Sequence, residues 1–172
     1  MKVTLLSFFF FISVNAFGAE HALGAHEHGA IILGMAVEKN VIDLDLDGPT
    51  ESFISFEYLP KTDSEKKIFN DVKNLWEKNL FKLIAFDKSL GCKVSQASFT
   101  QVIDEKETKK GQGVHSDVEA KAKINCLKNV IGTEVVIYLK KQFKNIKKLS
   151  AEIISSETKS VEINKPVQSV KI

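Results

Sequence analysis

The sequence contains no arginine, and its 172 residues include only four histidines, two cysteines and one tryptophan. Without arginine the chain lacks the planar guanidinium fork that favours two-point recognition of phosphate or carboxylate groups. The formal net charge is only +2, from 24 basic and 22 acidic residues, which argues against an electrostatic nucleic-acid binder. Apolar residues make up 44% and charged residues 27%, so we expect one soluble globular domain rather than a disordered or membrane-embedded chain.

The known sequence signatures of several enzyme classes are also missing. The chain has no Gly-x-Ser-x-Gly, no His-Glu-x-x-His and no glycine-rich phosphate loop. A catalytic zinc would need an open coordination position and a base such as Glu27 or Glu57, and nothing in the sequence singles out such an arrangement. We therefore expect a protein that is not an enzyme.

The first residues have the composition of an export signal. Lys2 is followed by an apolar run from Val3 to Val14, which is too short for a membrane helix and has the length of a secretory signal. Small residues after this run predict cleavage after Ala16 or after Gly18. We expect a signal peptide at 1–16, a histidine-containing arm at 17–29, and a periplasmic or secreted domain at 30–172 with no membrane-spanning segment.

Export changes the meaning of the two cysteines. Cys92 and Cys126 form an even pair, and an oxidising compartment favours a disulfide between them. In the chain-entropy account, closing a loop of about 35 residues stabilises the fold by roughly 3–4 kcal/mol. The alternative is that the two thiolates are metal ligands.

The hydrophobic pattern of the mature chain predicts an α+β fold, in which a mostly antiparallel β-sheet packs against one or two helices and carries one disulfide. The firmest element is a helix over 63–79, because Thr62 and Glu65 form a capping box in front of a helical apolar stripe. Alternation of apolar and polar residues predicts strands over 30–38, 41–46, 52–59, 92–103, 115–126, 149–154 and 160–163, and an edge strand over 167–172. Residues 134–146 fit either a second helix or a strand at 134–138.

A cluster of lysines near residue 144 is the other charge feature of the domain. Five lysines stand between positions 140 and 148. We interpret them as a solvated helix face, with an acidic partner or a lipid head group as the alternative.

The histidines carry the main functional signal, because three of the four fall within eight residues. His26 and His28 share one face of an extended segment just before the first strand, and His115 and Asp117 have the same spacing at the start of a later strand. If those strand ends are neighbours, imidazoles and a carboxylate converge into a set that suits Zn(II). The alternative is a solvated arm and an ordinary surface histidine.

His21 is a separate candidate. If cleavage follows Gly18, the mature chain begins Ala19-Glu20-His21. A free amine, two amide nitrogens and an imidazole at the third position can then bind Cu(II) or Ni(II) in a square plane.

The order of these motifs resembles the ZrgA-like family of bacterial periplasmic proteins associated with zinc uptake. The motifs are His-Glu-His-Gly-Ala at 26–30, Ser-Phe-Glu-Tyr-Leu-Pro at 55–60, Leu-Gly-Cys at 90–92, and His-Ser-Asp-Val-Glu-Ala at 115–120, followed by Cys126. The resemblance implies polar site residues at His26, His28, His115 and Asp117, and it adds Glu57.

The chain departs from the family pattern at two places. Tyr58 stands where the family has a histidine, and Ser55 replaces a glycine. The family's long histidine- and aspartate-rich insertion is reduced to 96–113, which contains no histidine. We therefore expect one fixed zinc site and no high-capacity reservoir.

Together these features predict a periplasmic zinc-binding accessory protein that assists zinc acquisition or homeostasis. It would bind Zn(II) through His26, His28 and His115, with Asp117 or Glu57 completing the shell, and would serve a component of a zinc-uptake system. The alternative is a disulfide-stapled interaction domain of the cell envelope in which metal binding is incidental.

Overall fold

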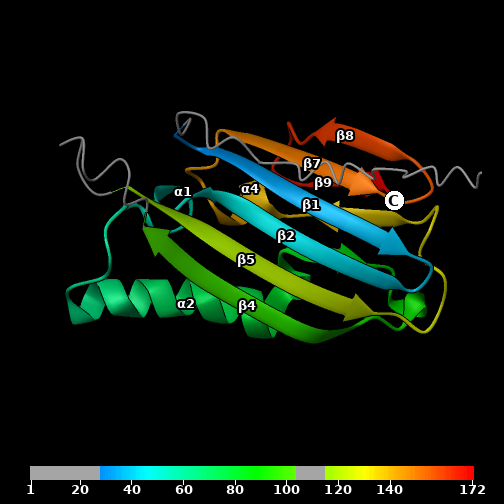
Figure 1. The fold of residues 1–172 in the computed structure, drawn as a ribbon, viewed down its shortest axis with the longest axis horizontal. Helices are drawn as coiled ribbons and strands as arrows, with labels where there is room; N and C mark the ends of the chain where they lie inside the picture. The colour runs from blue at the N-terminus through cyan, green and yellow to red at the C-terminus, as the bar shows by residue number, and fades with distance from the viewer. Residues whose placement is uncertain (1–27, 104–114) are drawn as a thin grey trace, which may run out of the picture.

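The structure, a computed structural model, describes residues 28–103 and 115–172. A large sheet of six strands is the main element, with the order β4-β5-β2-β1-β7-β8 (Figure 1). Its strands are β1 (Ala30–Glu38), β2 (Val41–Pro49), β4 (Lys93–Ile103), β5 (Ser116–Asn125), β7 (Lys148–Ile154) and β8 (Thr158–Glu162). All pairs are antiparallel except β1 and β7, which run parallel. The expected α+β class with a mostly antiparallel sheet is confirmed.

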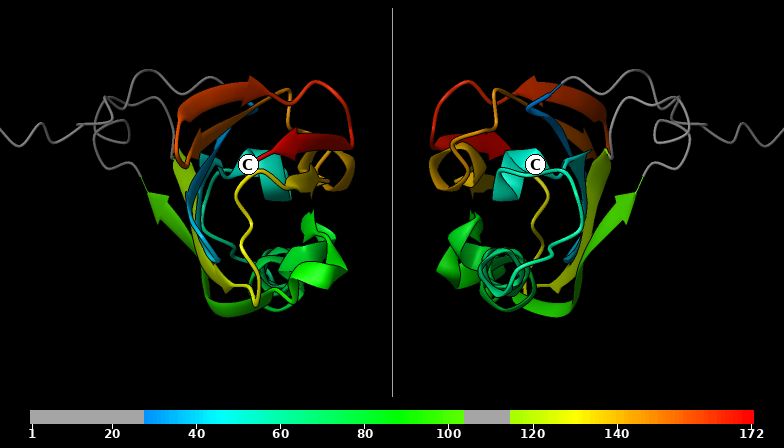
Figure 2. Two further views of the ribbon diagram at one scale, coloured as in Figure 1. Left: turned by 90° about the vertical axis from the view of Figure 1, so that its right-hand side faces the viewer. Right: turned by 90° about the vertical axis from the view of Figure 1, so that its left-hand side faces the viewer.

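A smaller sheet and several short helices lie on the side that the large sheet encloses (Figure 2). The small sheet has the order β3-β6-β9. Its strands are β3 (Ile84–Phe86), β6 (Glu134–Ile137) and β9 (Gln168–Lys171), and the short helices are α1 (Glu51–Ile54), η1 (Leu80–Lys82), η2 (Lys88–Leu90) and α4 (Leu139–Gln142). The expected strand at the C-terminal end therefore exists, at the edge of this small sheet. Residues 134–146 hold a strand and a single helical turn rather than one long helix.

The long helix α2 (Asp63–Asn79) begins and ends where the sequence predicts. Both halves of the capping box form, because the Thr62 side chain accepts from the Glu65 amide while Glu65 accepts from the Thr62 amide. Trp76 is buried, and its indole N–H donates to the carbonyl of Lys121 on β5 at 3.0 Å. This bond ties the helix to the middle of the large sheet.

The core follows from the alternation along the strands. On β1, β2 and β5 every second residue is buried, and these side chains belong to one hydrophobic cluster that also includes the inner face of the small sheet. Cys126 is buried at the end of this pattern and is bonded to Cys92. The predicted disulfide is confirmed, and thiolate metal ligation is thereby excluded for this oxidised state.

One expected strand is wrong. Residues 52–59 were expected to be extended, but the chain forms the single helical turn α1 and then an irregular segment. The turn ends at Ser55, which takes the left-handed conformation with φ 66°. A Thr-Glu pair directly after Gly48-Pro49 is a helix-start signal, but one turn is too short to show helical periodicity.

Candidate metal centre

One end of the large sheet gathers the polar residues of three chain segments. Because β2 runs antiparallel to both of its neighbours, β1 and β5, the end of β2 lies beside the start of β1 and the start of β5. His28 precedes β1, His115 precedes β5, and α1 follows β2 directly. The sheet topology therefore places His28 on one side, and His115 on the other side, of the turn that carries Glu51.

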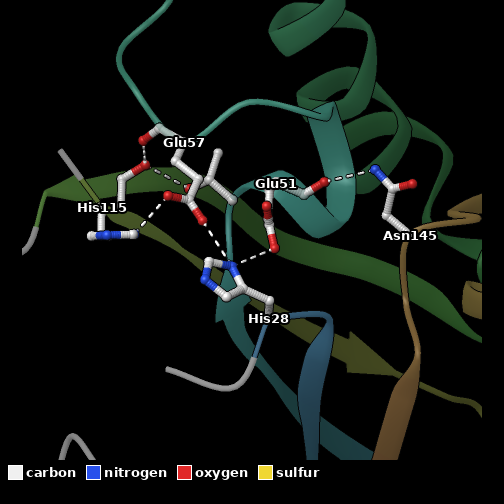
Figure 3. A network of polar contacts seen from close by, with 7 residues as sticks. His28, Glu51, Glu57, His115 and Asn145 are labelled. Carbon is white, nitrogen blue, oxygen red and sulfur yellow. Dashed lines mark hydrogen bonds and ion pairs between the residues drawn. The ribbon is translucent and has the colours of Figure 1, made fainter. Parts of the chain in front are cut away.

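Four side chains meet at this end of the sheet (Figure 3). The Nδ1 atom of His28 lies 2.6 Å from Oε1 of Glu51 and 3.1 Å from Oε1 of Glu57. The second carboxylate oxygen of Glu57 lies 2.6 Å from Nδ1 of His115. The two imidazole centroids are 5.9 Å apart. Glu57 thus stands between the two histidines and offers one oxygen to each.

The spacing of these atoms is close to what one zinc ion requires. The candidate ligand atoms of His28, Glu51 and Glu57 all lie within 4.8 Å of one another. Zinc holds nitrogen and carboxylate oxygen at about 2.0–2.2 Å, so atoms around one ion are separated by at most about 4 Å. Two imidazoles on one tetrahedral ion have centroids about 5 Å apart. Three of the four side chains therefore already meet this spacing, and His115 is joined to them through Oε2 of Glu57.

A buried hydroxyl holds the backbone of Glu57. The Ser116 hydroxyl donates to the Glu57 carbonyl and accepts from the Gln101 amide at 2.8 Å, and the Thr50 hydroxyl lies 3.0 Å away. Ser116 is the middle residue of the His-Ser-Asp motif and is only 2% exposed. The backbone amide of Thr50 also donates to the Ser116 carbonyl at 2.9 Å. These bonds fix the segment after α1 against the start of β5.

Glu51 is held from the other side by Asn145. The Asn145 side-chain amide donates to the Glu51 carbonyl at 3.0 Å (Figure 3), and it also donates to the Ser55 hydroxyl at 3.1 Å. The same carbonyl accepts from the Ser55 amide, which closes α1. The backbone of Glu51 is therefore held by a residue far away in the sequence.

Tyr58 is directed to α2. Its hydroxyl donates to Oε1 of Glu65 at 2.7 Å, and this bond to a carboxylate raises the pKa of Tyr58. The pKa of Glu65 is lowered to about 2, first by the Thr62 backbone amide and then by Tyr58 and the Lys61 amide. Tyr58 therefore supports the helix cap.

The predicted site residues divide into three groups. The structure brings together His28, His115 and Glu57, and it adds Glu51, which the sequence reasoning missed. Asp117 lies two residues further along β5, paired with Pro49, and is not in the group that shares ligand distances. His21 and His26, like the expected signal peptide, lie outside the described residues.

Comparison with known proteins bears on the whole domain. Residues 25–172 match the family model described as ZrgA family zinc uptake protein. A search of curated proteins found no match. No helix in the described part of the chain is long and apolar enough to cross a membrane.

Proposed function

Because the chain belongs to the ZrgA family of zinc uptake proteins, we propose that it is a periplasmic accessory protein that binds one Zn(II) ion. The carrying observation is the cluster in which His28 contacts both Glu51 and Glu57 while Glu57 also contacts His115. Two imidazoles and two carboxylates are borderline and hard ligands of the kind that zinc accepts. The zinc ion is the cargo, and these four residues are its proposed ligands.

The arrangement favours binding over catalysis. Four protein ligands fill the tetrahedral shell of zinc, whereas a catalytic zinc keeps one position for water or substrate. We propose that the zinc-loaded protein has no hydrolase activity. Release of p-nitrophenol from p-nitrophenyl acetate or phosphate at a rate above that of free zinc would contradict this part of the proposal.

The partial solvent exposure of the cluster suits an ion that is exchanged. The His28 side chain is 51% exposed, while Glu57 is 19% and His115 is 24% exposed. One side of the site is therefore in contact with solvent, and the other is fixed by buried hydrogen bonds. An accessory protein that accepts and passes on zinc needs this combination of a shaped site and access.

Calorimetric titration of the mature protein with zinc is the direct test. We expect one equivalent to bind with a dissociation constant below about 10 μM, and we expect His28→Ala/His115→Ala to abolish that binding. Glu51→Gln and Asp117→Asn form a matched pair, because the geometry selects Glu51 and the motif spacing selects Asp117. The zinc affinity of His26→Ala shows whether the arm at 17–29 contributes a ligand. Unchanged binding in the double histidine variant would refute the proposed site.

The proposed location has its own test. The disulfide is compatible with an oxidising compartment, and the signal pattern predicts a processed chain. N-terminal sequencing of the protein from a periplasmic extract should give Phe17 or Ala19 as the first residue. A start at Met1 would contradict the proposed export, and a start other than Ala19 would remove the Cu(II) or Ni(II) site at His21.

A further inference from the structure

The lysine segment at 140–148 lies directly beside the proposed metal site. The backbone amides of Lys147 and Lys148 donate to the carbonyl of Gly29 at 2.9 and 3.1 Å, and Lys148 pairs with Ala30 in the parallel β1–β7 ladder. Asn145 of the same segment holds Glu51. One stretch of chain therefore carries the lysines and supports the backbone at two of the four proposed ligands.

The charge of this stretch is of one sign. It contains Lys140, Lys141, Lys144, Lys147 and Lys148, and no acidic residue stands between Glu134 and Glu152. Within this stretch only the single turn α4 is helical. The lysines therefore do not form the solvated helix face that the sequence suggested. The apolar residues of the segment, Phe143 and Ile146, are buried in the core, as is Leu149 directly after it. The segment itself thus presents ammonium groups without exposed apolar side chains.

We propose that this lysine segment docks an acidic segment of a partner protein, whose carboxylates then take zinc from the site by ligand exchange. The proposal rests on the proposed zinc function and names the kind of partner that the site serves. A membrane surface is the less favoured occupant, because interfacial segments combine basic residues with exposed apolar anchors. Complementary charge would mainly raise the rate of encounter and fix the orientation of the partner.

A bound zinc ion would strengthen the attraction of an acidic partner to this surface. Loading the site brings two positive charges to an end of the domain that already carries the lysines. An acidic partner would therefore be attracted more strongly to the loaded than to the empty protein. No bond other than metal–ligand bonds changes in the exchange, because each carboxylate of the partner that joins zinc replaces a ligand of this chain.

The test uses two synthetic peptides that carry the same zinc-responsive dipicolylamine fluorophore. One peptide is rich in Asp and Glu, and the other has a neutral Gly/Ser sequence of equal length. We expect zinc transfer from the loaded protein to the acidic peptide to be about tenfold faster at low salt, and we expect the difference to shrink as salt is raised. Equal rates for the two peptides would overturn the proposal.

A charge-matched pair of variants locates the effect. Lys141→Glu/Lys144→Glu changes exposed lysines of the segment without removing a bond to Gly29 or Glu51. Lys82→Glu/Lys93→Glu makes the same change in net charge at two exposed lysines, and Lys93 pairs with Asn125 at the far end of β5. We expect the first pair to lose the advantage of the acidic peptide and the second to keep it. Equal loss in both pairs would assign the effect to overall charge and refute docking at the segment.

Two further measurements separate this proposal from the proposed function. Fluorescence anisotropy of the acidic peptide reports docking even if calorimetry shows no zinc binding. Normal zinc binding without preferential transfer would refute the docking proposal alone. If the protein cosediments with phosphatidylglycerol vesicles but does not bind the acidic peptide, the segment binds a lipid surface and the proposed protein partner is wrong.

Discussion

Ser116→Ala should weaken zinc binding although Ser116 is not a proposed ligand. The hydroxyl that is removed is the donor to the Glu57 carbonyl and an acceptor for Gln101. Gln101 keeps its bond to the Tyr58 carbonyl at 3.1 Å, so the principal losses are the donor that fixes Glu57 and the partner of the buried Thr50 hydroxyl. Removing the partner of polar groups that are buried or partly buried costs about 1–3 kcal/mol, and we expect the free energy of unfolding to fall by that amount.

The effect on zinc comes through the position of the Glu57 carboxylate. Loss of a residue that orients a metal ligand lowers affinity about 10–100-fold in typical sites. Calorimetry gives the affinity, and urea unfolding followed by the fluorescence of Trp76 gives the stability. Trp76 is the one tryptophan of the chain and is 1% exposed, so its emission reports global unfolding.

Ser52→Ala is the matched control. Ser52 is also a buried serine and lies on α1, but its hydroxyl has no hydrogen-bond partner among the described residues. Its replacement should leave both stability and zinc affinity nearly unchanged, because no bond is lost. If Ser116→Ala lowers stability but keeps the zinc affinity of the native protein, Ser116 is merely structural and the positioning argument fails.

Three further predictions concern the scaffold. Cys92→Ser/Cys126→Ser should lower the free energy of unfolding by about 3–4 kcal/mol, measured in urea against the oxidised protein; no change would mean that the loop is constrained by other contacts. Glu65 has a folded pKa of about 2, below its usual value of 4.5, so its stabilising effect is present above about pH 4.5 and is lost as the pH falls towards 2. The difference in unfolding free energy between the native protein and Glu65→Gln should shrink over that range, and a constant difference would contradict the cap assignment. Gly29→Ala should weaken zinc binding in calorimetry, since Gly29 has φ 83° and a Cβ there would lie 2.9 Å from the Asn145 carbonyl oxygen; native affinity would show that the neighbouring backbone can yield.

The elements that the sequence predicts correctly are those with a local signal. The helix at 63–79 has a capping box and a helical stripe, and β5 has five buried residues at alternate positions. The disulfide follows from an even pair of cysteines in a chain whose first residues predict export. These conclusions depend on residues that are neighbours in the sequence, or on the number of cysteines, and not on the packing of distant segments.

The site required long-range information. Glu51 approaches His28 only because α1 turns back over the end of β2, and its carbonyl is held by Asn145 from the other end of the chain. Strand alternation placed His115 and Asp117 on one face, but His115 precedes β5, where alternation does not yet hold. Tyr58 could be seen to replace a histidine, whereas its bond to Glu65 depends on the packing of α2.

The parallel pairing of β1 with β7 has a consequence for the order of folding. It joins Ala30 to Lys148, so the first strand of the domain completes its ladder only after most of the chain is available. Contacts of such high sequence separation form late and slow the search for the native state. The proposed ligands His28 and Glu51 depend on that late-arriving segment, through Gly29 and Asn145 respectively. We expect a nascent or truncated chain to be unable to sequester zinc, which leaves the metal to copies of the protein that have finished folding.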